Sequence, residues 1–329
     1  MRVFLLGRTE FLYDTALALS AAGHEIVAVV TAKSSPEYQR NENDFRELAE
    51  THGAFFICTQ KIKGEVLDLG RLTGADVCVS INWVSILHDD FIDLFPHGVL
   101  NAHFGDLPRY RGNAVINWAI LQGEQEVCLT VHKMVAGELD AGDIALKVPL
   151  RLEEKTTISD IVTFARENVP SMFCSVLHGM QAGTQVFQSQ QDTGLDPMRC
   201  YPRLPQDGLI NWKLSAVEIN ALVRSLTKPY SGAYTYWRRS DTEILKVGIW
   251  QSRVISDGCV DLGVPGHVIL NDPNNGESWI YTGKGILAVS QVTIGESQDI
   301  VQPGSVWKSI RMRLGLNMED EIYRLYKTS

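Results

Sequence analysis

The chain has 329 residues, 45% of them hydrophobic, which is enough to bury a large core and favours two domains over one. Its formal net charge of −9 and its pI of about 5.4 lack the electrostatic footprint of a protein that holds nucleic acid by its phosphates. No uncharged apolar stretch approaches the ~20 residues that span a bilayer, and no basic leader precedes the first apolar run. A cytoplasmic protein with no membrane contact is therefore expected.

Six cysteines occur singly, with no C-x-x-C pair, and several lie in apolar runs: Cys58, Cys78, Cys128, Cys174, Cys200 and Cys259. This pattern favours small buried side chains in a reducing compartment over disulfides or a zinc site.

Short apolar runs alternate with helical patterns over the first 150 residues. The strand-like runs are Val3–Leu6, Ile26–Val30, Phe55–Cys58, Val77–Ile81 and Val99–Ala102, and helical patterns surround Tyr13–Leu19 and Phe45–Ala49. Apolar runs of this length are typical of strands that are covered on both faces, so a mostly parallel α/β sheet is expected. Ligands of such sheets bind beyond the carboxyl ends of the strands, where Asn101 falls.

A further strand pair, Leu129–Lys133 and Ile144–Leu150, brackets a loop over 136–142, and a long helix is expected from Ile158 to Met180. Polar, aperiodic, proline-containing sequence follows, which is typical of a linker. The interpretation is a first domain over 1–187, a linker over 188–206 and a second domain over 207–329.

The second domain begins with an amphipathic helix, Ala216–Ser225, and continues as short alternating strands separated by turn residues. The strands are expected around Tyr234–Trp237, Ile244–Ile249, His267–Leu270 and Ile286–Val292. This predicts a small all-β domain. A closing helix is expected from about residue 304, carrying Trp307, Ile310, Leu314, Ile322 and Leu325.

The turn after the first apolar run argues against a nucleotide cofactor. It reads Gly7-Arg8-Thr9-Glu10, which keeps one glycine of the G-x-G-x-x-G fingerprint and places a carboxylate where a pyrophosphate would bind. No Walker lysine motif is present either. Dehydrogenase and P-loop functions are disfavoured.

The densest polar cluster lies over residues 101–112. Asn101 and His103 are two positions apart, so their side chains leave one face of an extended strand. An amide donor beside an imidazole suits attack on a carbonyl, because the amide stabilises the oxyanion and the imidazole moves the proton. Asp140 could orient the imidazole if the fold brought it close.

Each of these residues also has an ordinary structural interpretation. A single histidine is more often structural than catalytic, and Asn101 and Asp140 are common turn residues. His97, His103 and His132 lack the spacing of a short ligand motif, so no metal is expected. The combination of motifs is what favours chemistry.

That combination resembles the 10-formyltetrahydrofolate-dependent formyltransferases, which include methionyl-tRNA, glycinamide ribonucleotide and sugar-nucleotide members. Their signature is N-x-H, then L-P-x-x-R-G, then D-x-G. Here it is Asn101-Ala102-His103, Leu107-Pro108-Arg109-Tyr110-Arg111-Gly112 and Asp140-Ala141-Gly142. Segments 118–124, 207–212 and 229–235 continue the similarity, so it covers most of the chain up to about residue 300.

The resemblance implies a Rossmann-like first domain and a smaller, OB-like β-barrel as the second. It implies a catalytic trio of Asn101, His103 and Asp140, with 10-formyltetrahydrofolate as the formyl donor and no metal. By position, the backbone that holds the folate corresponds to Ser85, Ile86, Leu87, Ala136, Gly137, Glu138 and Leu139. Residues placed to contact the acceptor are Tyr110, Arg111, Gly112, Asn113 and Trp118.

The acceptor is the open part of this prediction. Asp106 departs from the family pattern and adds a negative charge that suits a cationic amine. Initiator-tRNA enzymes tend to carry a basic insertion where this chain has mixed charge, over 32–44, so tRNA is disfavoured as a partner. The preferred acceptor is the primary amine of a dTDP-, UDP- or GDP-linked amino sugar used for surface polysaccharides. A methionyl-tRNA formyltransferase, a formyltetrahydrofolate hydrolase and a non-catalytic folate- or sugar-binding protein are the alternatives, and a homodimer is left open.

Overall fold

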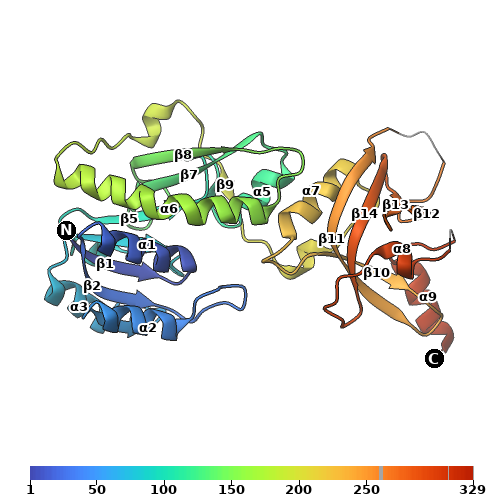
Figure 1. The fold of residues 1–329 in the computed structure, drawn as a ribbon, viewed down its shortest axis with the longest axis horizontal. Helices are drawn as coiled ribbons and strands as arrows, with labels where there is room; N and C mark the ends of the chain where they lie inside the picture. Colours follow the sequence, from blue (N-terminus) through green and yellow to red (C-terminus); the bar gives the residue numbers. More distant parts are fainter. Residues whose placement is uncertain (259–261, 310, 329) are drawn as a thin grey trace. The chain divides into compact units, whose positions relative to one another are not determined.

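The computed structural model describes residues 1–258, 262–309 and 311–328, so Cys259 and Ile310 lie outside the described residues. The chain forms two compact units (Figure 1). The first comprises Met1–Ile116, Gln125–Leu152 and Asp160–Pro202, and the second comprises Asn117–Glu124, Glu153–Ser159 and Arg203–Ser329.

The first unit is built on a seven-stranded sheet in the order β3-β2-β1-β4-β5-β7-β8. Its strands are β1 (Arg2–Gly7), β2 (Glu25–Thr31), β3 (Phe55–Cys58), β4 (Val77–Ile81), β5 (Val99–His103), β7 (Glu126–Lys133) and β8 (Ile144–Arg151). The first five are parallel to one another, β7 is antiparallel to its neighbour β5, and β8 is antiparallel to β7. The mostly parallel α/β sheet predicted from the apolar runs is confirmed.

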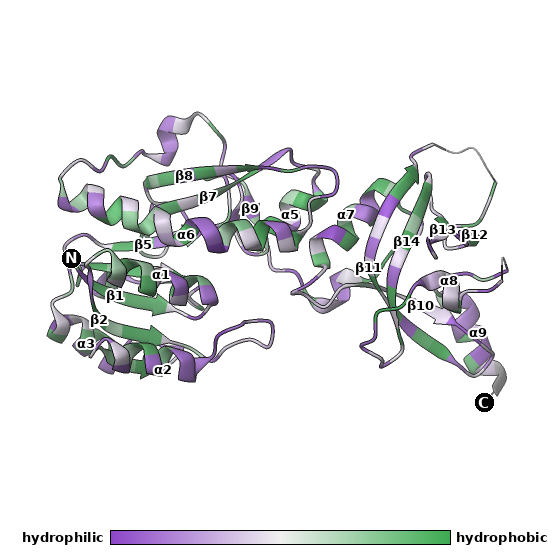
Figure 2. Cartoon of the chain, in the orientation of Figure 1, coloured by the Kyte–Doolittle hydropathy of each residue, from purple (hydrophilic) through white to green (hydrophobic). Residues whose placement is uncertain are grey.

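Alternate side chains of the strands fill two separate cores. Val3 and Leu5 of β1 pack in one core with residues of α1 (Glu10–Ala21), α2 (Glu42–Thr51) and α6 (Ile158–Gln181). Phe4 and Leu6 point the other way, into a core with α3 (Glu65–Thr73) and α4 (Asp89–Ile92). Because both faces are covered, β1 and β2 are hydrophobic along their length (Figure 2).

The glycine that ends β1 serves packing. A Cβ on Gly7 would lie 2.0 Å from the carbonyl oxygen of Ile81, and its φ of +153° is one that other residues rarely adopt. Only glycine lets β1 approach the end of β4 this closely. This contact accounts for the single glycine in a turn that lacks the dinucleotide fingerprint.

The segment predicted to be a linker, 188–206, belongs with the first unit as far as Pro202. It contains the 3₁₀ helix η1 (Gln190–Thr193) and the short strand β9 (Arg199–Cys200), which pairs with β6 (Arg111–Gly112). Gln188 and Ile144 also exchange backbone hydrogen bonds. Polar, aperiodic sequence is common to free linkers and to segments held by hydrogen bonds, so composition alone did not separate the two.

The second unit contains a five-stranded antiparallel sheet in the order β10-β11-β14-β13-β12. Its elements are η2 (Pro205–Gly208), α7 (Ala216–Leu226), β10 (Ala233–Arg238), β11 (Ile244–Ser256), β12 (Val268–Asn271), β13 (Ser278–Tyr281) and β14 (Ile286–Ile294). The core joins residues of α7 and of the sheet, and it includes Trp212 and Trp307. Leu314 N donates to Gly266 O beside β12, and Gly315 N donates to Tyr236 O in β10. The OB-like barrel stays a prediction.

The single closing helix expected from residue 304 is wrong. The structure instead has α8 (Pro303–Val306) and α9 (Met318–Thr328), and the residues described between them, 307–309 and 311–317, are irregular, with Gly315 at φ +87°. Trp307 and Leu314 are buried in that irregular stretch, whereas Leu325 on α9 is 71% exposed. Among the described residues, no helix has the length and apolarity needed to cross a membrane.

Candidate active site

Strand β5 carries the first two residues of the predicted trio. Asn101 and His103 lie two positions apart, at the carboxyl end of the strand, and face the same side. The neighbouring strand β7 runs antiparallel and places His132 opposite Asn101 and Thr130 opposite His103. The register of this strand pair therefore decides which β7 side chains surround the two residues.

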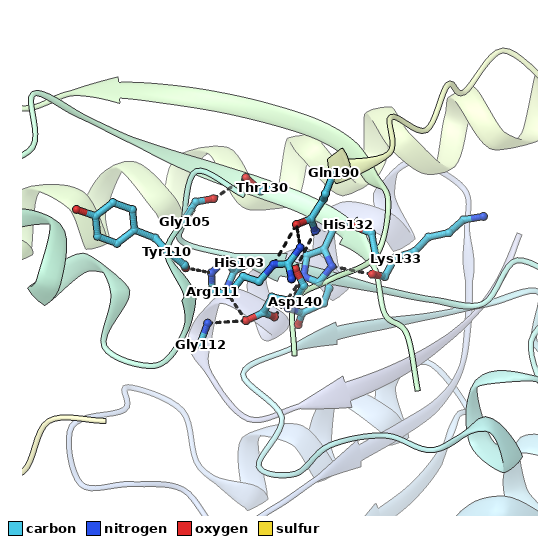
Figure 3. Close-up of polar contacts among 12 residues, drawn as sticks. His103, Gly105, Tyr110, Arg111, Gly112, Thr130, His132, Lys133, Asp140 and Gln190 are labelled. Carbon is cyan, nitrogen blue, oxygen red and sulfur yellow. Dashed lines mark hydrogen bonds and ion pairs between the residues drawn. The ribbon is translucent and has the colours of Figure 1, made fainter. Parts of the chain in front are cut away.

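Asp140 reaches the same place from the loop between β7 and β8. Its Oδ2 lies 3.5 Å from His103 Nδ1 and its Oδ1 lies 3.5 Å from His132 Nε2. The backbone N–H of Gly112 donates to Oδ2 at 2.9 Å. The Asp140 side chain is 8% exposed. Figure 3 shows the carboxylate beside His103 and Gly112. Asn101 is linked to this group through His132, whose Nε2 lies 3.2 Å from the Asn101 amide nitrogen and 3.5 Å from Asp140 Oδ1.

Both ring nitrogens of His103 face acceptors. Nε2 lies 2.6 Å from the carbonyl oxygen of Tyr110, and Nδ1 faces the carboxylate of Asp140. A neutral imidazole has one N–H and satisfies one of these acceptors, whereas the imidazolium satisfies both. The two acceptors therefore favour the protonated form of the His103 ring.

Burial and neighbouring charges shift the pKa values of His103 and Asp140. Burial lowers the pKa of His103 below its ordinary value, while the carboxylate of Asp140 raises it, and His132 and Arg111 lower it. Burial alone would raise the pKa of Asp140, but His103, His132 and the Gly112 N–H together hold it well below its ordinary value. Asp140 is thus an anion beside an imidazole whose pKa is lowered by burial and raised by the carboxylate.

The sequence suggested His132 only as a possible metal ligand. Its position beside Asn101 and Asp140 was not predicted. It is fully buried, and its Nδ1 lies 2.7 Å from the carbonyl oxygen of Lys133. A carbonyl oxygen only accepts, so Nδ1 donates there, and Nε2 lies 3.2 Å from the amide nitrogen of Asn101. In the part of the chain that the structure describes, no group of three His, Cys, Asp or Glu side chains could hold a metal ion.

The two loops predicted to hold folate lie against each other. Gly137 N donates to Leu87 O at 3.2 Å, which joins the segment 85–87 to the segment 136–139. The Leu87 side chain is buried in the core, while Ser85 accepts a hydrogen bond from the Trp83 ring. Large apolar side chains are exposed along both loops: Val84, Ile86 and Val135.

The residues predicted to contact the acceptor have different surroundings. Tyr110 is buried at φ +59°, and Asn113 is exposed. The Arg111 guanidinium donates to the side chain of Gln190, a residue that the sequence did not single out. Trp118 lies on α5 (Val115–Leu121), with the Arg203 guanidinium over its ring.

The negative charge of Asp106 is already paired. Lys147 Nζ lies 2.7 Å from its carboxylate and 2.5 Å from the carbonyl oxygen of Leu107. Thr130 holds the same loop through the carbonyl of Gly105, as Figure 3 shows. Because Lys147 already pairs with the Asp106 carboxylate, this charge is less available to attract a cationic amine.

Comparisons with known proteins identify relatives of the chain. The profile of the formyl transferase family matches residues 1–177, and the profile of its C-terminal domain matches residues 204–310. A methionyl-tRNA formyltransferase of Geobacter metallireducens is 31% identical over 259 residues, which cover 76% of this chain and 80% of that protein.

Two solved structures show a similar fold. HypX from Aquifex aeolicus matches with a TM-score of 0.56 and 15% identity over 94% of this chain, which spans about half of HypX (49%). An N-formyltransferase from Helicobacter canadensis, solved with folinic acid and dTDP-3-aminofucose, matches with a TM-score of 0.57 and 14% identity over 88% of this chain and 99% of that one. On the two profile matches and the 31% identical relative, the chain belongs to the formyl transferase family.

Proposed function

We propose that the protein transfers a formyl group from 10-formyltetrahydrofolate to a primary amine, with Asn101, His103 and Asp140 as its catalytic residues. One observation carries the proposal. A buried, ionised carboxylate contacts an imidazole whose strand neighbour, two residues away, presents an amide at the carboxyl edge of the sheet. A donor, a proton acceptor and a charge that stabilises the protonated acceptor are the groups that acyl transfer needs.

The steps follow from these groups. The unprotonated amine attacks the formyl carbon, a nitrogen–carbon bond forms, and the carbonyl oxygen becomes an oxyanion that accepts an N–H from Asn101. His103 takes the proton that the amine loses, and Asp140 stabilises the imidazolium. The bond from the formyl carbon to N10 of the folate then breaks, and N10 receives the proton. Because Nε2 already contacts the Tyr110 carbonyl, the amine reaches this nitrogen only when that contact opens.

The joined loops 85–87 and 136–139 are the proposed folate site. Their backbone groups supply donors and acceptors, and the exposed side chains of Val84, Ile86 and Val135 supply apolar surface for a flat ring. The presence of folinic acid in the similar Helicobacter canadensis structure supports a folate donor.

We propose a nucleotide-linked amino sugar as the acceptor. Residues 1–202 carry 16 Lys and Arg against 26 Asp and Glu, and residues 203–329 carry 14 against 13. The catalytic half is therefore strongly acidic, which disfavours a polyanion such as tRNA. The amino-sugar nucleotide in the Helicobacter canadensis complex supports the same choice. Initiator tRNA is the second candidate, because the 31% identical relative is a methionyl-tRNA formyltransferase.

An acceptor panel tests the function. Purified protein is incubated with 10-formyltetrahydrofolate and, in turn, dTDP-, UDP- and GDP-linked amino sugars, charged initiator tRNA, or no amine, while tetrahydrofolate release is followed. Release that depends on an amino-sugar nucleotide is expected. Release with tRNA alone would support the second candidate, and release without any amine would indicate a hydrolase.

Two substitutions test the catalytic residues. Asn101→Ala and His103→Ala should each lower turnover by about 100- to 1,000-fold, the usual effect of losing an oxyanion donor or a general base. Circular dichroism and the unfolding midpoint should stay close to wild type, which shows that folding is intact. Near wild-type turnover in either variant would refute the assignment.

A further inference from the structure

Gln190 is buried next to the candidate active site, yet it comes from neither matched part of the family. It is 4% exposed and begins the 3₁₀ helix η1. The family profiles cover residues 1–177 and 204–310, so the segment that carries it lies between them. A buried carboxamide needs partners for both of its ends, and its partners show what it holds.

The carboxamide joins two loops that meet at the catalytic centre. Its oxygen accepts from Arg111 Nε at 3.1 Å and Nη2 at 2.5 Å. Its nitrogen donates to the carbonyl oxygens of Asp140 at 2.8 Å and Gly142 at 2.7 Å. The donors of arginine and the two carbonyl acceptors fix the orientation, because a flipped amide would place like groups together (Figure 3).

The backbone that Gln190 holds is one that does not form readily. Asp140 has a φ of +49°, in the left-handed region that residues with a side chain rarely adopt, at a cost on the order of 1 kcal/mol. In this conformation its carboxylate reaches Gly112, His103 and His132 together. Two hydrogen bonds to the carbonyls at this turn oppose its relaxation.

We propose that Gln190 is a positioning residue of the formyl transfer reaction, which fixes the Asp140 backbone so that the carboxylate acts on His103. The inference rests on the proposed function of Asp140, but it concerns a contact that can be measured without turnover. Gln190 does not touch the reacting atoms, so it changes the rate through the residues that it holds, and the proposal concerns its effect through Asp140.

A double-mutant cycle tests the proposal. The His103 pKa is measured by NMR titration of the imidazole nitrogens in wild type, Asp140→Asn, Gln190→Ala and the double variant, without substrate. Asp140, His132 and Arg111 face this ring, and the cycle cancels any change that comes from Arg111 or His132. Asp140→Asn should lower the His103 pKa in the wild-type background and lower it by less than half as much in the Gln190→Ala background. Equal effects in both backgrounds would overturn the proposal.

The turnover number kcat provides a second test of the role of Gln190. Gln190→Ala should lower kcat about 100-fold with little change in KM for the folate, as expected when a catalytic group is displaced by about 1 Å. Gln191→Ala is the matched control, since that side chain is exposed on the same 3₁₀ helix. Gln191→Ala should keep wild-type kcat, and a loss equal to that of Gln190→Ala would also contradict the proposal.

A third variant tests the oxygen and the nitrogen of the carboxamide separately. It also keeps the proposal testable if Gln190→Ala does not fold. Gln190→Glu keeps an acceptor for Arg111 but turns an oxygen toward the carbonyls of Asp140 and Gly142. It should lose kcat at least as strongly as Gln190→Ala, whereas wild-type kcat would show that only the Arg111 contact matters and refute the inference. Full activity of Asp140→Asn would refute the proposed function alone, and the NMR cycle would still decide the role of Gln190.

Discussion

Replacing Asp140 by asparagine keeps the shape of the side chain and removes its charge. The carboxylate lies 3.5 Å from His103 Nδ1 in a site that is 8% exposed. At this distance, with an effective dielectric constant near 20, a unit charge pair is worth roughly 5 kcal/mol. If His103 becomes cationic in the transition state, Asp140→Asn should lower kcat by at least about 1,000-fold.

The same substitution shifts the pH dependence in a known direction. Asp140 raises the pKa of His103 against the effect of burial, so removing the charge lowers this pKa further. The reactive form of His103 is the neutral ring, and the acid limb of kcat/KM should move to lower pH. Single-turnover rates of formyl transfer from pH 4.5 to 8 measure both effects. A plateau within fivefold of wild type, or a limb that moves to higher pH, would refute the reasoning.

Two further predictions concern buried contacts. His132→Leu removes the acceptor that holds the Asn101 amide at 3.2 Å, and it should lower kcat by about tenfold, the value of one hydrogen bond, with KM for the folate unchanged in steady-state assays. An unchanged kcat would show that Asn101 needs no such support. Gly7→Ala places a Cβ 2.0 Å from Ile81 O and should lower the free energy of unfolding by about 3 kcal/mol in urea titrations. Gly23→Ala, at φ +86° with open space around it, should cost about 1 kcal/mol, and an equal loss in both would show that backbone conformation alone decides.

The grouping of Asn101 and His103 could be predicted because two-residue spacing on a strand fixes a common face. The meeting with Asp140 could be expected only from the family resemblance, since it depends on the pairing of β5 with β7 and on the loop that follows. His132 illustrates the limit. Its position opposite Asn101 is a property of strand register, and nothing in the run Thr130-Val131-His132-Lys133 indicates which strand lies beside it.

The elements of the second unit show a different limit. Strand β13 was missed because Ser278–Tyr281 is short and follows turn residues directly. The closing helix was placed wrongly because apolar residues at Trp307 and Leu314 suggested helical spacing, whereas both are buried from irregular backbone. Periodicity reports which side chains face a core, and it identifies the element only when the backbone is regular.

The proposed restraint on Asp140 gives a reason for a polar segment about fifty residues later to pack within the first unit. A carboxylate on a loop residue in the left-handed conformation keeps its place only while contacts hold that backbone. A buried glutamine supplies both donors while its oxygen fixes Arg111 on the facing strand β6, and β6 is in turn paired with β9. The segment that carries Gln190 and β9 therefore contacts both the loop of Asp140 and strand β6. Its polar residues, which suggested a linker, supply the hydrogen bonds that these contacts need.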